Sequence, residues 1–151
     1  MKLQRRQFLA SLLAVPAVAA LAQSGPPLVE VWKSPTCGCC KDWVKHMQDN
    51  GFRVRVTETA SHTMRTQLGI GEQYGSCHTA RVGAYAIEGH VPARDIKRLL
   101  AEKPAAIGLA VPAMPIGSPG MDGPEYGGRR DPYDVLLLQK GGGSAVFQAY
   151  R

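Results

Sequence analysis

Three cysteines crowd into the segment TCGCC at residues 36–40. Cys37 and Cys40 have the C-x-x-C spacing of a redox pair, and Cys39 adds a third thiol that such a pair does not need. A fourth cysteine, Cys77, lies further on in the segment GSCHTA. Thiolates and thioethers are the ligands that bind Cu(I), zinc and iron–sulfur clusters. These residues therefore indicate either thiol redox chemistry or the binding of a soft metal.

The same four cysteines are badly spaced for structural disulfides, the usual use of an even cysteine count in an exported protein. Cys39 and Cys40 are neighbours, and a bridge between neighbours is strained. Only Cys77 lies outside the cluster, so at least one of two bridges would close within it. Such a short loop restrains the unfolded chain little. A reactive or metal-binding cluster explains the spacing better.

The N-terminus predicts export. Residues 1–22 have a basic start, an apolar run and small residues before a cut after Ala22, the pattern of a signal peptide. Arg5 and Arg6 also fit a twin-arginine signal, which carries folded proteins, and both routes stay open. The expected location is the periplasm, without a membrane anchor after the signal is removed.

Charge argues against a nucleic-acid partner. Removing Lys2, Arg5 and Arg6 with the signal lowers the formal net charge from +6 to +3. The remaining lysines and arginines are scattered, and no basic stripe is interleaved with aromatic residues.

We expect a monomer of one domain.

The elements that position the cysteines follow from the pattern of apolar residues. Alternation predicts strands over 27–34 and 52–59, with an amphipathic helix between them that Thr36 caps and Gly51 ends. A short helix over 62–70, a loop over 71–79, a hairpin over 80–92 with its turn at Glu88-Gly89, and a helix over 93–103 follow. The order β-α-β-α-β-β-α over residues 23–103 is the α/β layout of a thioredoxin-like core.

The remainder, residues 104–151, reads as a C-terminal extension. Residues 104–133 are rich in proline and glycine and show no clear period, so the sequence predicts no strand there. They carry too many apolar residues for a disordered linker, and we expect them to pack on the core. Residues 134–150 predict a final β-hairpin around Gly141–Gly143.

This layout places the cysteine trio at the start of a helix. Free backbone N–H groups and the helix dipole stabilise thiolates there. In a thioredoxin-like fold the loop before the third strand faces this helix start, and here that loop carries Cys77. Four sulfurs are therefore predicted to converge, with Cys37, Cys39, Cys40 and Cys77 as metal ligands.

Methionines and histidines extend the candidate site. Met121 is a further candidate ligand because prolines and glycines hold it outside a helix, whereas Met114 is a weaker one. The role of His78, next to Cys77, stays open. His90 is expected to hydrogen-bond locally near the hairpin turn. The remaining expectations are an exposed His46 and packing roles for Met47 and Met64.

Four segments together resemble the CopG-type family of small periplasmic copper-resistance proteins, long described only as a domain of unknown function. They are KSPTCGCCKDWVKHM, GSCHTARVGAYAIEGHVPARDIKRLL, GLAVPAMPIGSPGM and PYDVLLL. The resemblance spans about residues 28–150 and includes the family's C-x-C-C motif. It implies a thioredoxin-like domain with a C-terminal extension, copper bound by Cys37, Cys39, Cys40 and Cys77, and a link to copper resistance.

Three functions fit these residues. The first is a periplasmic protein that holds more than one Cu(I) ion per chain and can cycle copper between oxidation states, with copper efflux or chaperone proteins as partners. The second is a thiol–disulfide oxidoreductase that uses Cys37 and Cys40. The third is a domain with a structural zinc site.

Overall fold

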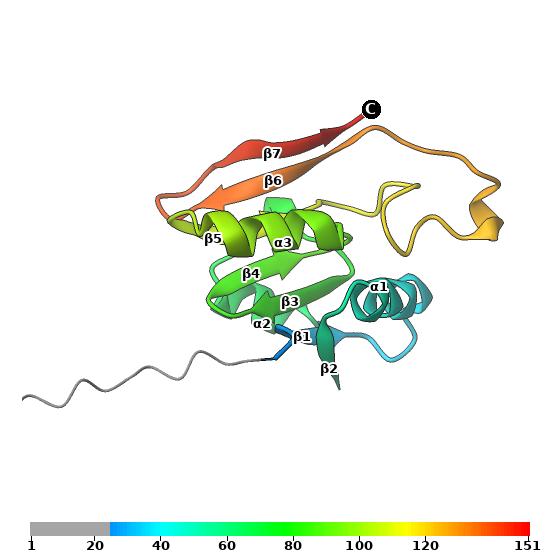
Figure 1. Ribbon diagram of the computed structural model, residues 1–151, viewed down its shortest axis with the longest axis horizontal. Helices are drawn as coiled ribbons and strands as arrows, with labels where there is room; N and C mark the ends of the chain where they lie inside the picture. Colours follow the sequence, from blue (N-terminus) through cyan, green and yellow to red (C-terminus); the bar gives the residue numbers. More distant parts are fainter. Residues whose placement is uncertain (1–24) are drawn as a thin grey trace, which may run out of the picture.

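The computed structural model describes residues 25–151, so the predicted signal peptide at 1–22 lies outside the described residues. The described chain forms one seven-stranded sheet in the order β2-β1-β3-β4-β5-β6-β7 (Figure 1). No helix among these residues is long and apolar enough to span a membrane. The elements are β1 (Leu28–Lys33), α1 (Gly38–Asp49), β2 (Arg53–Glu58), α2 (His62–Gln67), β3 (His78–Val82), β4 (Tyr85–Glu88), α3 (Ala93–Glu102), β5 (Ala106–Ala110), β6 (Tyr133–Gln139) and β7 (Ser144–Tyr150).

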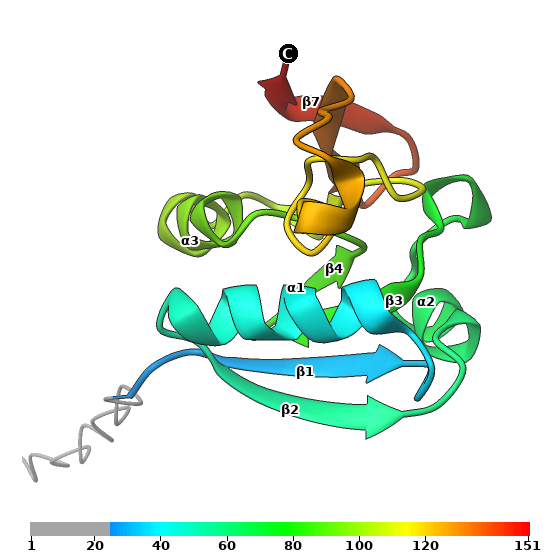
Figure 2. The ribbon, with the colours of Figure 1, turned by 90° about the vertical axis from the view of Figure 1, so that its right-hand side faces the viewer.

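The first part of the sheet has the predicted thioredoxin-like layout. β1 pairs in parallel with β2 and antiparallel with β3, and β3 and β4 form an antiparallel hairpin. Helices α1 and α3 lie on one face of the sheet and α2 lies on the other (Figures 1 and 2). The α/β class and the element order β-α-β-α-β-β-α are therefore confirmed.

The core lies between α1, α3 and the central strands. Trp43 and Met47 of α1 are fully buried, as are Ile96 and Leu99 of α3. Their positions repeat at three or four residues, which puts each pair on one helix face. The indole N–H of Trp43 donates to the backbone carbonyl of Val91 at 2.9 Å, which ties α1 to the start of α3.

The hairpin turn differs from its predicted place. β3 ends at Val82 and β4 begins at Tyr85, so the turn lies at Gly83-Ala84 and not at Glu88-Gly89. Gly83 supplies the positive φ of 57° that a tight turn favours. Gly89 also has a positive φ, but it follows β4, where its N–H donates to the carbonyl of His78 at 3.0 Å.

A second correction concerns residues 104–133, which contain the strand β5. It pairs in parallel with β4 and antiparallel with β6. Small residues make its β pattern weak, yet the close approach to β4 requires one of them. A Cβ atom on Gly108 would lie 1.7 Å from the carbonyl oxygen of Ala86. The predicted final hairpin is confirmed, because β6 and β7 pair on either side of residues 140–143.

The loop between β5 and β6 returns to the start of α1. A Cβ atom on Gly120 would lie 2.5 Å from the carbonyl oxygen of Cys39 and 2.8 Å from the backbone nitrogen of Trp43. Gly120 also has a positive φ of 83°. The chain can pass this close to the helix only because this residue has no side chain.

Candidate metal centre

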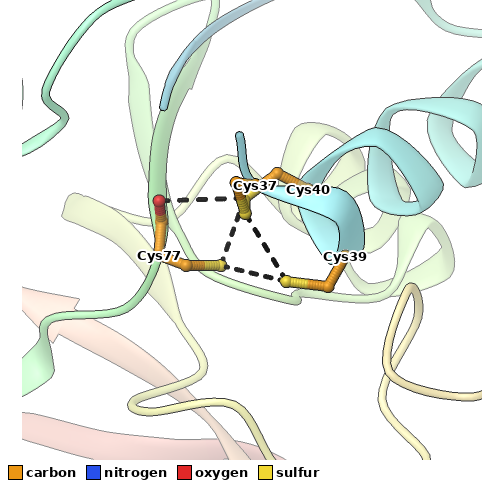
Figure 3. A group of neighbouring side chains, drawn as sticks. All are labelled: Cys37, Cys39, Cys40 and Cys77. Carbon is orange, nitrogen blue, oxygen red and sulfur yellow. Dashed lines mark hydrogen bonds between the residues drawn. A yellow bond between two sulfur atoms is a disulfide. The ribbon is translucent and has the colours of Figure 1, made fainter. Parts of the chain in front are cut away.

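The four cysteines meet at one end of the sheet (Figure 3). Cys37 is the N-cap of α1, Cys39 and Cys40 lie in its first turn, and Cys77 directly precedes β3. All four sulfur atoms lie within 4.8 Å of one another. We call this group the four-sulfur cluster.

Two of these sulfurs are bonded to each other. Cys37 and Cys40 form a disulfide, whereas Cys39 and Cys77 are free thiols. Each free thiol touches one sulfur of the bridge: Cys39 lies 3.5 Å from Cys37, and Cys77 lies 3.3 Å from Cys40. The two free thiols are 3.8 Å apart. The cluster therefore combines a C-x-x-C redox pair with two further sulfur donors.

The helix start differs in one detail from the prediction. Thr36 lies one residue before the N-cap position of α1, and its hydroxyl lies 3.0 Å from the hydroxyl of Ser34. Cys37 is the N-cap residue, and no side chain accepts the first N–H groups of the helix. These N–H groups and the helix dipole still favour negative charge on nearby sulfurs.

Cys77 is a protonated thiol in the metal-free chain. Burial, and after it the negative charge of Cys39, raises the pKa of the Cys77 thiol to about 12. A metal ion that binds this sulfur must therefore displace a proton. The positive charge of a bound metal ion would also offset the negative charge of the Cys77 thiolate, which burial disfavours.

His90 is a site residue that the sequence did not identify. Its Nε2 lies 3.0 Å from the sulfur of Cys77, and its Nδ1 lies 2.8 Å from the carbonyl oxygen of Pro119. A carbonyl only accepts, so Nδ1 carries the proton and Nε2 presents a lone pair towards Cys77. Burial lowers the pKa of His90, which keeps the imidazole neutral. The prediction that His90 hydrogen-bonds locally near the hairpin turn is therefore wrong, because its partners Cys77 and Pro119 are distant in the sequence.

The misplaced turn explains why His90 was missed. With the turn at Gly83, the register pairs Thr79 with Glu88. The residues after Glu88 then lie beside the start of β3, where Cys77 is. A correct turn would have placed His90 next to Cys77.

His78 also touches the cluster. Its Nδ1 lies 3.4 Å from the sulfur of Cys77, while its Nε2 is buried without a hydrogen-bond partner in the described structure. The ring centroid lies 4.4 Å from that of Trp43. Burial, followed by the charges of His90 and Lys33, lowers the pKa of His78 well below its usual value. Cys77, His78 and His90 form a second group of potential metal ligands within 4.8 Å.

A buried ion pair holds the backbone just before Cys77. Glu88 is completely buried, and its Oε1 accepts from the Nε of Arg65 at 2.9 Å and from the N–H of Ser76 at 2.7 Å. Thr79 donates to its Oε2 at 2.7 Å. Arg65 also donates from Nη2 to the carbonyl of Ser76 at 2.7 Å. Both backbone groups of Ser76 are thus fixed, which fixes the approach of Cys77 to α1.

The remaining predicted residues lie in different environments. Met121 is buried and follows Gly120, the residue packed on Cys39; its sulfur accepts a hydrogen bond from the Tyr126 hydroxyl at 3.4 Å. Its role as a ligand stays a prediction. Met114 is 48% exposed. His46, expected to be exposed, is half-buried, and its Nε2 accepts the Ala93 N–H at 3.1 Å.

The donor set suits a soft ion. Two sulfurs that each lie about 2.3 Å from a tetrahedral ion are about 3.8 Å apart, and Cys39 and Cys77 have a separation of 3.8 Å. Neutral imidazole and thiolate are ligands of copper and zinc. The cysteine and histidine cluster is therefore able to bind metal.

Comparison with known proteins supports this assignment. A family model described as "Protein of unknown function, DUF411" matches residues 74–121, which include Cys77, His90 and Met121. No match was found among curated proteins. A solved structure named "Copper resistance protein copG- Form 2" is 42% identical, with a TM-score of 0.77, over 83% of this chain and 99% of that chain.

The chain belongs to the CopG family. A second CopG structure, named "Form 1", is also 42% identical, with a TM-score of 0.76, over 83% of this chain and 98% of that one. The resemblance to this family read from the sequence is confirmed, and so is the fold that it implied. The chain is therefore a homologue of proteins named for copper resistance, and it has a cysteine and histidine cluster that is able to bind metal.

Proposed function

We propose that this chain binds Cu(I) in the four-sulfur cluster, holds more than one ion when all four thiols are reduced, and contributes to copper resistance. The observation that carries the proposal is the convergence of Cys77 with the C-x-C-C trio from a different part of the chain. Four thiolates that can bridge neighbouring ions suit Cu(I), which prefers soft sulfur ligands. The names of the two CopG structures support the choice of copper.

The ligand set of the proposed site is Cys37, Cys39, Cys40 and Cys77, with Met121 as a further thioether. His90 joins it because its neutral Nε2 already faces Cys77. The proposed setting is the periplasm, on the strength of the signal peptide predicted over residues 1–22. Copper efflux or chaperone proteins there are the proposed donors and acceptors of the ions.

The test is a Cu(I) titration of the fully reduced chain without oxygen, against a chelator that reports free Cu(I). We expect more than one copper per chain and protection of all four cysteines from alkylation. Zinc that stays bound as a single ion and is unmoved by Cu(I) would instead identify a structural zinc site.

A second candidate function has one specific observation in its favour, the disulfide between Cys37 and Cys40. It is thiol–disulfide exchange with other proteins, for which this pair alone would suffice. Reduction of insulin disulfides that survives both Cys39→Ser and Cys77→Ser would support it. Copper binding requires those two thiols and predicts no such activity.

A further inference from the structure

The disulfide divides the donors of the site into two sets. Cys37 and Cys40 are bonded to each other, so neither can act as a thiolate while the bridge is intact. Cys39 and Cys77 are free, and Nε2 of His90 is directed at Cys77. Besides His78, whose Nδ1 lies 3.4 Å from the sulfur of Cys77, three donors therefore remain when the bridge is closed. These three come from α1, from the residue before β3 and from the segment after β4.

Two pairs among these donors lie close together, Cys39 with Cys77 and Cys77 with His90. The sulfurs of Cys39 and Cys77 are 3.8 Å apart, the separation expected for two thiolates on one ion. The sulfur–sulfur distances that involve the bridge are shorter, 3.5 Å from Cys39 to Cys37 and 3.3 Å from Cys77 to Cys40. Those are contacts with a bonded sulfur. The spacing thus singles out the two free thiols as a ligand pair.

His90 is already oriented towards Cys77, the sulfur that the two close pairs share. Its Nδ1 donates to the carbonyl of Pro119 at 2.8 Å, which leaves Nε2 unprotonated. A metal-bound histidine commonly donates its other ring N–H to a carbonyl or carboxylate, which fixes the orientation of the ring. The ring therefore needs no new partner in order to bind an ion through Nε2.

We propose that the oxidised chain keeps a one-ion Cu(I) site formed by Cys39, Cys77 and His90, and that the Cys37–Cys40 disulfide limits the copper capacity of the chain. This inference rests on the proposed copper binding. It adds that the redox state of Cys37 and Cys40 sets how many copper ions the chain can bind. Reduction by a dithiol breaks the Cys37–Cys40 bond. Two electrons and two protons pass to its sulfurs, and the reductant closes to its own disulfide. Two more thiols then become ligands, each of which releases its proton when copper binds.

The test compares one protein in two redox states. Chain whose Cys37–Cys40 disulfide is verified by peptide mapping, and chain reduced with a dithiol and then desalted, are each titrated anaerobically with Cu(I) in acetonitrile. We expect one copper per oxidised chain and more than one per reduced chain. Cys77→Ser or His90→Gln should weaken the single oxidised-form ion by about tenfold or more.

A matched variant isolates the three-donor site. The double variant Cys37→Ser and Cys40→Ser has no bridge and keeps Cys39, Cys77 and His90, so it should bind one copper whether or not it is treated with the dithiol. An oxidised chain that binds no copper, or a double variant that binds as many ions as the reduced chain, would overturn the inference. Reduced wild-type chain that binds no copper would instead overturn the proposed function.

Discussion

The sulfur of Cys77 lies 3.0 Å from Nε2 of His90, and the two residues flank the β3–β4 hairpin. The antiparallel pairing of β3 with β4 brings the two ends of this hairpin together. The carbonyl of Pro119, on the loop between β5 and β6, then orients the imidazole. A thiol, an imidazole and the C-terminal extension are thereby joined in one arrangement at the start of α1.

The His90 contact predicts a loss of copper affinity in His90→Gln. The glutamine can still hydrogen-bond, but it lacks the imidazole nitrogen, so Cu(I) affinity of the reduced chain should fall by about tenfold or more. Competition with a Cu(I) chelator measures this. His62→Gln is the control because His62 is exposed at the start of α2. Equal affinities of the two variants would remove His90 from the site.

The buried Arg65–Glu88 pair predicts that changing Glu88 lowers Cu(I) affinity only when Cys77 is present. Replacing a partner of a buried ion pair disturbs the groups that it holds, here the backbone of Ser76. Glu88→Gln should therefore weaken Cu(I) binding by about tenfold. The same change in a Cys77→Ser background should have little further effect, since the residue being positioned is gone.

A double-mutant cycle on Cu(I) affinity distinguishes this positioning role from general destabilisation. Glu30→Gln is the matched control, because Glu30 pairs with Arg81 at the surface of the same sheet. Equal losses of affinity from Glu88→Gln with and without Cys77 would refute the positioning role.

Met121 has its own prediction. Met121→Leu keeps an apolar side chain of similar volume and removes the thioether, so the chain should retain copper less well. The free energy of unfolding should change by less than about 1.5 kcal/mol. Met47→Leu is the control, since Met47 is a fully buried core residue of α1. Retention equal to that of wild type would exclude Met121 as a ligand.

Gly120 tests the packing of the extension on α1. Gly120→Ala places a Cβ 2.5 Å from the carbonyl oxygen of Cys39 and forces alanine to adopt a positive φ. We expect a loss of about 1–3 kcal/mol in the free energy of unfolding. Gly127→Ala separates the two causes, because Gly127 has a φ of 61° with no atom within 4 Å of an added Cβ. Equal losses in both variants would mean that the contact with Cys39 contributes nothing.

The buried histidines predict acid sensitivity of the metal-free chain. Burial lowers the folded-state pKa values of His78 and His90, whereas a histidine in the unfolded chain has a pKa of about 6.5. Their contribution to stability is therefore complete above about pH 6.5 and is lost as the pH falls below it, because the unfolded chain binds more protons. The slope is at most about 1.4 kcal/mol per pH unit for each histidine.

Thermal unfolding between about pH 7.5 and pH 5 measures this slope. His78→Phe should flatten it, since the ring is replaced by one that does not titrate, and His62→Gln should leave it unchanged. A His78→Phe chain with the same slope as the wild-type chain would show that the His78 ring is not held neutral by the fold.

The sequence predicted the meeting of Cys77 with the trio because topology alone decides it. In a β-α-β unit followed by an antiparallel strand, the start of the first helix and the loop before that strand lie at the same end of the sheet. His90 could not be placed in this way, since its position depends on the exact residues of one turn. Gly83 and Gly89 both have positive φ, and local pattern does not reveal which of them forms the turn.

The strand β5 was missed for a different reason. AIGLA, residues 106–110, is short and consists mostly of small residues, so its strand propensity is low. Its place is set by tertiary packing, where Gly108 allows the close approach to Ala86. The disulfide between Cys37 and Cys40 agrees with the C-x-x-C spacing, but the spacing alone did not distinguish a bridge from a set of metal ligands.

In the proposed function, Cys77 and the C-x-C-C trio hold the same Cu(I) ions. Copper K-edge X-ray absorption of the reduced, Cu(I)-loaded chain tests it most directly, with Cys77→Ser measured in parallel. The account predicts a first shell dominated by sulfur together with a short copper–copper scattering path, both diminished in Cys77→Ser. A shell of nitrogen and oxygen, or a spectrum that Cys77→Ser leaves unchanged, would contradict it.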